Sequence, residues 1–121
     1  MPANMKLFNI QKEPTLTPFG IEGPGTFKSD NPLFQGDDFR QIQTCIDWLK
    51  DKKLKKTLNK NSSSYGIKHI LERELDTYVS NGCFIAAVIH LEIPYYKIPE
   101  SPNIFIPMAS REFYKNIKAP F

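Results

Sequence analysis

A cluster of lysines is the feature of this chain whose residue types most directly suggest chemistry. Residues 50–60 carry a formal charge of +5, from six lysines and one aspartate, whereas the whole chain carries +3, so the remaining residues sum to −2. Ammonium groups at this density attract phosphate groups without regard to base sequence, and they attract acidic protein surfaces in the same way. The candidate binding residues are Lys50, Lys52, Lys53, Lys55, Lys56 and Lys60.

The same lysines fit a simpler interpretation, a solvated helix end whose cations complement the negative pole of the helix dipole. No aromatic residue lies between Trp48 and Tyr65, so the segment does not indicate stacking of single-stranded bases. In a helix, four of the lysines would lie roughly along one side: Lys52, Lys53, Lys56 and Lys60.

Cys83 is the candidate nucleophile. It follows Ser80-Asn81-Gly82, where a helix is expected to begin, and the dipole at a helix N-terminus lowers the pKa of a thiol. With His69 or His90 as the base, it would form a Cys–His dyad. However, Cys83 also begins a run of seven apolar residues, 83–89, which favours burial. We therefore expect no catalytic site and do not expect an enzyme.

Metal and cofactor sites are not indicated. The residues of types that bind zinc are Cys45, His69, Cys83 and His90, and none of their spacings is typical of a zinc site. The glycine-rich stretch 20–25 matches neither a P-loop nor a dinucleotide-binding motif. We expect no metal ion and no cofactor.

The composition indicates one globular domain. A chain of 121 residues buries roughly two-thirds of its unfolded surface, so it folds without disulfides or metals. Two cysteines are too few for a disulfide framework and favour a reducing cytosol. The longest apolar run is seven residues, whereas a membrane span needs about 20, and no signal-peptide pattern is visible. We expect a small, soluble cytoplasmic protein without membrane contact.

Residues 1–36 read as an extended arm. They contain five of the ten prolines and four of the six glycines, which disfavour a long helix or a central strand. Aromatic and aliphatic residues are scattered among them, more than a pure linker would carry. The arm docks on the core or on a partner, or it moves freely, and the sequence leaves these alternatives open.

Residues 37–121 read as a helical domain with three helices. The first begins at Asp37 and ends either near Asp51 or near Leu58; the second begins at Ser63 or Ser64. The third, Cys83 to Leu91, is apolar nearly all round and should be buried on most sides, with a β-strand as the competing interpretation. The apolar stripe of the first helix is Phe39, Ile42, Cys45, Ile46 and Leu49, and that of the second is Ile67, Ile70, Leu71, Leu75, Tyr78 and Val79.

The fold class predicted from these elements is mostly α, with three helices packed around the third. The segment after Pro94 is irregular, with one short strand at 104–106 that Pro107 should stop. A helix-turn-helix is not indicated, because the third helix has no polar side chains to offer to base edges. The second and third helices therefore read as an αα-corner.

One pattern resembles a known type of sequence. Ser64-Tyr65-Gly66-x-Lys68-His69, followed by Tyr78-Val79-Ser80-Asn81-Gly82-x-Phe84-Ile85-Ala86-Ala87, is similar to small uncharacterised proteins of bacteria and phages. The resemblance implies a small helical protein of mobile-element type. It implies no activity and no residue roles, and both the arm and the lysine segment lie outside it.

The function expected from the sequence is that of a non-catalytic binding protein, an adaptor or inhibitor that acts on another protein. The absence of a catalytic constellation and the apolar residues of the proline-rich arm both favour it. The alternative is a nucleic-acid-binding protein that uses residues 50–60, and a Cys-dependent enzyme ranks below both. Association into a homodimer is left open.

Overall fold

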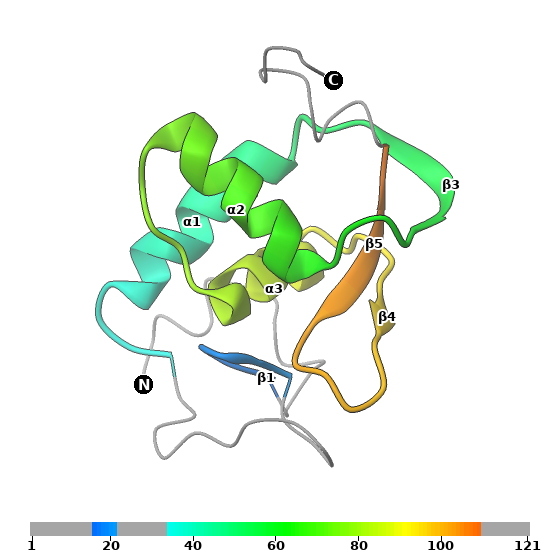
Figure 1. The fold of residues 1–121 in the computed structure, drawn as a ribbon. Coiled ribbons are helices and arrows are strands. Elements are labelled where there is room, and N and C mark those ends of the chain that lie inside the picture. The colour runs from blue at the N-terminus through cyan, green and yellow to red at the C-terminus, as the bar shows by residue number, and fades with distance from the viewer. Residues whose placement is uncertain (1–15, 22–33, 110–121) are drawn as a thin grey trace.

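Three helices and two small antiparallel sheets make up the described part of the chain (Figure 1). The structure is a computed structural model, and it describes residues 16–21 and 34–109. The helices are α1 (Asp38–Leu49), α2 (Ser64–Leu75) and α3 (Asn81–His90). Strands β1 (Leu16–Thr17) and β2 (Gly20–Ile21) form a hairpin, and β3 (Leu54–Asn59), β4 (Tyr96–Lys97) and β5 (Ile104–Met108) form a sheet of order β3-β5-β4.

The predicted mostly-α fold class is wrong. The fold is α/β, with 41% helix and 21% strand among the described residues. The three helices and a short strand at 104–106 were predicted, and what was missed is that β3, β4 and the β1–β2 hairpin form from segments expected to be helical or irregular. The pairing of β3 with β5 joins residues about 50 positions apart, so no local periodicity in the sequence reports it.

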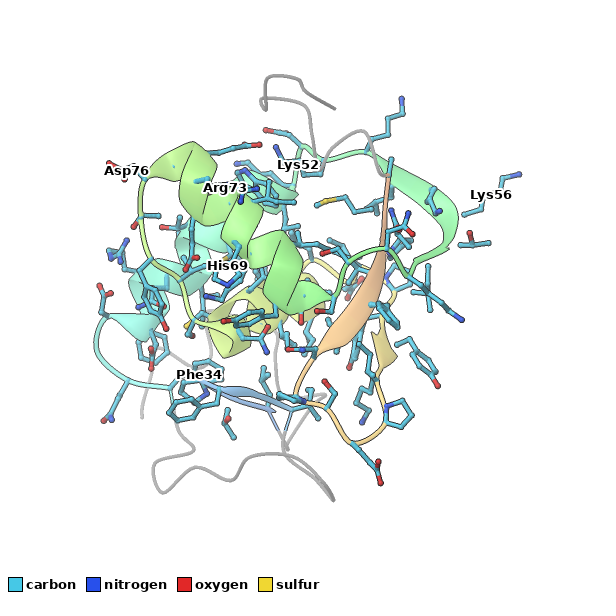
Figure 2. The ribbon with its side chains drawn as sticks, viewed as in Figure 1. Phe34, Lys52, Lys56, His69, Arg73 and Asp76 are labelled. Carbon is cyan, nitrogen blue, oxygen red and sulfur yellow. The ribbon has the colours of Figure 1, made fainter. Side chains whose placement is uncertain are left out.

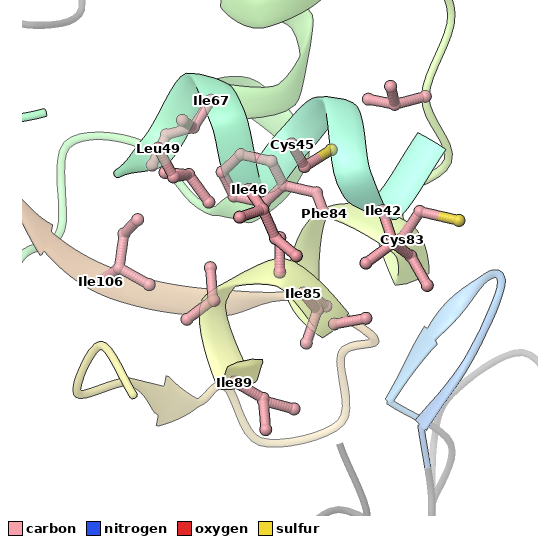
Figure 3. Packing of buried hydrophobic residues seen from close by; sticks show 14 of the residues in the cluster. Ile42, Cys45, Ile46, Leu49, Ile67, Cys83, Phe84, Ile85, Ile89 and Ile106 are labelled. Carbon is pink, nitrogen blue, oxygen red and sulfur yellow. The ribbon is translucent and has the colours of Figure 1, made fainter. Parts of the chain in front are cut away.

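Helix α3 is the centre of the hydrophobic core. Every residue from Asn81 to Ile89 is buried, which confirms the prediction for the third helix. Figure 3 shows the apolar side of α1 packed against α3, with Ile106 of β5 closing the core from the sheet. Two faces of α3 are thus covered by helices and sheet, and β1 and β2 also lie against it. The packed side chains include Ile42, Cys45, Ile46, Leu49, Phe84, Ile85 and Ile89.

The N-terminus of α3 is buried as well, and the β1–β2 turn covers it. Ser80 caps the helix by accepting a hydrogen bond from Cys83 N at 3.1 Å, and Gly82 N donates to the carbonyl of Pro18 at 3.0 Å. A Cβ atom on Gly82 would contact the carbonyl of Thr17 and come within 2.6 Å of Pro18. The helix and the turn can approach this closely only because residue 82 is glycine.

The described part of the N-terminal arm is docked. Leu16 and Ile21 of the hairpin are buried, and Ile21 N donates to Pro102 O at 3.0 Å. Phe34, just before α1, is also buried. Residues 1–15 and 22–33, which make up most of the predicted arm, lie outside the described residues, as does 110–121.

Helix α1 ends early, and the lysine segment forms an edge strand instead of its last turns. The helix ends at Leu49, so of the two predicted ends the one near Asp51 is right and the extension to Leu58 is wrong. Asp37 is the N-cap residue, but its carboxylate does not cap a backbone N–H. It accepts hydrogen bonds from the side chains of Arg40 and Gln41 instead, and these bonds lower its pKa to about 2.

Among the described residues, no helix is both long and apolar enough to cross a bilayer.

Strand β3 bows away from β5 (Figure 1). Leu54 pairs with Met108 and Asn59 with Ile106, so five steps along β3 match two steps along β5. The shift coincides with Pro107, which lies between the two pairs and has no N–H to donate. The prediction that Pro107 stops the strand is wrong, because β5 continues through it to Met108 and the irregularity falls on β3.

Replacing Gly82 with alanine tests the close approach of the β1–β2 turn. Alanine has the higher helix propensity by about 1 kcal/mol, yet we expect Gly82→Ala to lower the free energy of unfolding by about 3 kcal/mol, because rigid backbone must move. Gly66→Ala in α2 is the matched control. Its Cβ would meet only the Ser62 side chain, which can rotate, so we expect a change within about 1 kcal/mol. Urea denaturation of both variants measures the difference, and equal stabilities would contradict the role of Gly82.

Candidate functional site

An open cleft of about 510 Å³ lies between α1, α2, the start of α3 and the β1–β2 turn. We call it the aromatic cleft. Its size is within the range of sites that hold a small ligand or a few side chains of a partner. It is lined by Pro18, Phe19, Asp38, Gln41, Tyr65, Lys68, His69, Glu72, Tyr78, Ser80 and Asn81.

Glu72 organises the α2 wall of the cleft. Its Oε2 accepts from Lys68 Nζ and from Val79 N, both at 3.1 Å, and its Oε1 lies 2.8 Å from His69 Nδ1. Burial alone would raise the pKa of Glu72, but the hydrogen bonds from Val79, Lys68 and His69 outweigh it and hold the pKa below its usual 4.5. The carboxylate is therefore ionised at neutral pH, and it ties the loop after α2 to the helix.

Lys68 is a buried lysine held between two aromatic rings. Its side chain is 5% exposed, and its Nζ lies 5.2 Å from the ring centre of Tyr65 and 5.0 Å from that of Tyr78. Both distances are typical of cation–π contacts. Together with its ion pair to Glu72, these contacts compensate the ammonium group for the loss of water.

His69 lies midway along α2 (Figure 2) and is fixed on two sides. Its Nδ1 faces Glu72, and its ring meets that of Tyr65 edge-on with 4.5 Å between ring centres. Its side chain is 44% exposed. The sequence offered His69 as a possible base for Cys83, whereas the structure places it in the wall of the cleft.

Three aromatic rings at the cleft are about half exposed. Phe19 is 53% exposed, Tyr65 52% and Tyr78 62%. Tyr78 was predicted to lie on the buried stripe of the second helix, and this is wrong because α2 ends at Leu75. Asp76, at its C-cap, adopts a positive φ of 51°, which turns the chain before residue 78. Leu75, from the same predicted stripe, is also exposed.

The opposite wall of the cleft is polar. Gln41 Oε1 accepts from Ser80 N at 2.8 Å, which joins α1 to the start of α3. Asn81 Nδ2 donates to Asn103 Oδ1 at 2.9 Å and reaches the carbonyls of Phe19 and Pro102 at 3.3 and 3.4 Å. Asn81 Oδ1 is buried and has no hydrogen-bond partner among the described residues.

The six lysines of residues 50–60 do not form one surface, because they lie in different environments. Lys52 is nearly buried, with Nζ 4.3 Å from the ring centre of Trp48 and 3.9 Å from Glu74. Lys50 pairs with Asp47 at 3.7 Å. These contacts, and the strand geometry of residues 54–59, overturn the expectation that Lys52, Lys53, Lys56 and Lys60 share one helical side.

The remaining lysines lie at the sheet edge. Lys53, Lys55, Lys56 and Lys60 are exposed, and Lys55, Lys56 and Lys60 form no ion pair with any described residue. Figure 2 shows Lys56 on the outward curve of β3, well separated from His69. Charged side chains on an outer strand also prevent edge-to-edge pairing with another chain, so this placement has a structural explanation of its own.

Cys83 is not placed as a nucleophile. Its side chain is fully buried, and its Sγ lies 3.4 Å from the carbonyl and 3.8 Å from the carboxylate of Asp38, not beside His69 or His90. Burial raises the pKa of the Cys83 thiol to about 12, aided by Asp38 and opposed by the hydrogen bond with Ser80. The expected dipole effect is therefore outweighed by desolvation. Within the described ranges, no group of three or more His, Cys, Asp or Glu residues could hold a metal ion.

Six of the eleven residues that line the cleft belong to the sequence pattern that resembles small proteins of bacteria and phages. Both halves of the Ser-Tyr-Gly-x-Lys-His and Tyr-Val-Ser-Asn-Gly pattern contribute to its walls: Tyr65, Lys68 and His69 from the first, and Tyr78, Ser80 and Asn81 from the second. What the sequence could not show is that Phe19 and Asp38, from distant segments, join them.

No protein-family model matches the chain, and neither a curated protein nor a solved structure shows significant similarity to it.

Thiol titration tests the placement of the cysteines. Both Cys45 and Cys83 are buried, and burial raises the pKa of each thiol. We expect the native protein to react with a thiol reagent at pH 7.5 far more slowly than free cysteine does, and to release two reactive thiols in denaturant. A native thiol that reacts as fast as free cysteine would contradict this arrangement.

Replacing Glu72 with glutamine tests its role in the cleft wall. The substitution leaves the buried ammonium of Lys68 without its counterion, so we expect the free energy of unfolding at neutral pH to fall by about 3 kcal/mol. Asp51→Asn is the matched control, since Asp51 is exposed and forms no ion pair with a described residue.

The pH dependence of stability gives an independent check on Glu72. Because its folded pKa lies below 4.5, Glu72 stabilises the fold fully above its unfolded pKa, and this contribution is lost as the pH falls through the folded value. We expect the stability of the native sequence to fall more steeply below about pH 5 than that of Glu72→Gln. Parallel curves from denaturant titrations at several pH values would rule this out.

Proposed function

We propose that the protein is a non-catalytic binding protein that holds a short segment of another protein in the aromatic cleft. The observation that carries the proposal is the meeting of three half-exposed aromatic rings, Phe19, Tyr65 and Tyr78, around one concavity. Aromatic side chains supply much of the binding energy at protein interfaces, because they bury a large area with little loss of side-chain entropy.

The rings are held in place before any partner binds. Lys68 contacts the faces of Tyr65 and Tyr78, and His69 supports Tyr65 from the side. The turn that carries Phe19 is closed by Thr17, whose Oγ1 accepts from Phe19 N and donates to Gly20 O, both at 3.1 Å. Preorganised side chains lose less entropy on binding, so this arrangement favours recognition.

The charge of the cleft favours a protein partner over a nucleic acid. Asp38 and Glu72 contribute two negative charges and Lys68 one positive charge, so the formal charge of the acidic residues and the lysine in the lining is −1. A phosphate backbone needs a surface with a net positive charge. The exposed lysines of β3 lie apart from the cleft, and Lys50 and Lys52 already pair with acidic residues.

The state of the potential catalytic groups also favours binding over catalysis. A catalytic base must lie within hydrogen-bond reach of the group it activates. Among the described residues, the contact of His69 with Glu72 is not continued to a hydroxyl or a thiol. Cys83 is buried and its raised pKa keeps the thiol protonated at neutral pH.

Selection from a displayed library of random 12-residue peptides tests the proposal. We expect the immobilised protein to enrich peptides whose affinity falls roughly tenfold or more in Tyr78→Ala, as for a hot-spot aromatic residue. Tyr96→Ala is the matched control, because Tyr96 on β4 is 47% exposed but lies outside the cleft. Its affinity for the same peptides should be unchanged.

Two outcomes would overturn the proposal. One is that the library yields no peptide that binds the protein in solution. The other is that the enriched peptides bind Tyr78→Ala as tightly as the native sequence, which would place their site elsewhere. Phe19→Ala serves as a second cleft variant, so that any loss of the Lys68 contact in Tyr78→Ala does not decide the result.

A further inference from the structure

We infer that the aromatic cleft recognises an arginine side chain in the partner segment. The inference deepens the proposed function and rests on it. It is carried by two residues that line the same cleft: Asp38, whose carboxylate has no cationic partner among the described residues, and Asn81, whose buried side-chain oxygen has no donor among them.

Asp38 provides a negative charge that no cation within the described residues balances. Its Oδ2 accepts a hydrogen bond from Gln35 N at 2.9 Å, and the one contact of its Oδ1 within the described part of the chain is the weak 3.8 Å contact with Cys83 Sγ. The other carboxylates nearby are paired, Glu72 with Lys68 and Asp37 with Arg40. A ligand that covers the cleft removes water from Asp38, and this is unfavourable unless the ligand brings a positive charge.

Asn81 has a side-chain oxygen that needs a hydrogen-bond donor. The exposed fraction of Asn81 is 7%, and hydrogen bonds determine the orientation of its side-chain amide. Its Nδ2 faces three oxygens, those of Phe19, Pro102 and Asn103, so a rotated amide would set oxygen against oxygen. Its Oδ1 is thus fixed as a buried acceptor that finds no donor in residues 16–21 or 34–109, which is unfavourable unless a ligand supplies one.

The aromatic rings favour the same ligand. The chain's own Lys68 shows that Tyr65 and Tyr78 accept a cation at their faces, and the Lys68–Glu72 pair is neutral as a unit. Phe19 and Tyr78 leave more than half of their surface open to a second, flat cation. A guanidinium group stacks on such rings and offers five donors in one plane, whereas the ammonium of a lysine is a compact point charge. Arginine therefore satisfies the carboxylate, the amide oxygen and the rings together.

The test compares N-acetyl-arginine amide with N-acetyl-citrulline amide, which has nearly the same shape but no charge. Each is titrated into the 121-residue chain, and backbone amide chemical shifts report binding. We expect shifts at residues around the cleft with the arginine compound, and roughly tenfold weaker binding of the citrulline compound, since only the former satisfies Asp38.

Asp38→Asn supplies the second arm of the test. Asparagine keeps an oxygen that can accept from Gln35 N, so the fold is retained and only the charge is removed. We expect this variant to bind the arginine compound about tenfold more weakly and to bind both compounds alike. Asp51→Asn, which removes an exposed charge outside the cleft, should leave the preference for arginine unchanged.

Each result separates this inference from the proposed function. Equal binding of the two compounds by the native protein, or an undiminished preference in Asp38→Asn, overturns the inference. If the arginine compound does not bind but cleft-dependent peptides from the display selection do, the inference fails and the proposed function stands. If neither binds, both are wrong.

Discussion

The burial of helix α3, including its N-terminus, is the constraint on which the rest of the structure depends. A helix N-terminus leaves backbone N–H groups without helical partners, and inside a protein each one needs an acceptor. Here Ser80 and the carbonyl of Pro18 supply acceptors, and the side chain of Asn81 binds the turn and the β4–β5 loop in return. Gly82 makes room for this contact because it has no Cβ. The small β1–β2 hairpin is therefore part of the core, although it is only two residues long on each side.

The same contacts create the aromatic cleft. Because the β1–β2 turn must cover the start of α3, it presents Phe19 opposite the surface of α2. Glu72 fixes the other side, since its bond with Val79 N holds the loop that carries Tyr78. A buried ion pair with Lys68 contributes little net stability after desolvation, but it specifies the position of two rings. In this protein the polar interactions of the cleft chiefly determine geometry, and the apolar packing around α3 supplies most of the stability.

The lysine segment shows how local sequence can mislead. Four of its six lysines were predicted to share one side of a helix, yet residues 54–59 form an outer strand and Lys52 lies over Trp48. Isolated lysine-rich segments have good helix propensity, but tertiary pairing overrides a preference of a few tenths of a kcal/mol per residue. The partner strand β5 lies about 50 residues further along the chain, where Ile104, Ile106 and Met108 are buried on the core side. Pairing with β5 therefore determines that residues 54–59 form a strand, and β5 lies outside any local window of the sequence around them.

The sequence by itself determined the elements whose signals are local. The spacing of apolar residues predicted α2, the apolar run 83–89 predicted the buried α3, and Ser80-Asn81-Gly82 predicted a helix start, because these signals involve residues close together in the chain. Only the tertiary structure decided the sheet, the exposure of Tyr78, the raised pKa of Cys83 and the meeting of Phe19 and Asp38 with α2. Each of these depends on desolvation or on contacts between distant segments. Such quantities are set by how the whole chain packs, and no window of the sequence contains them.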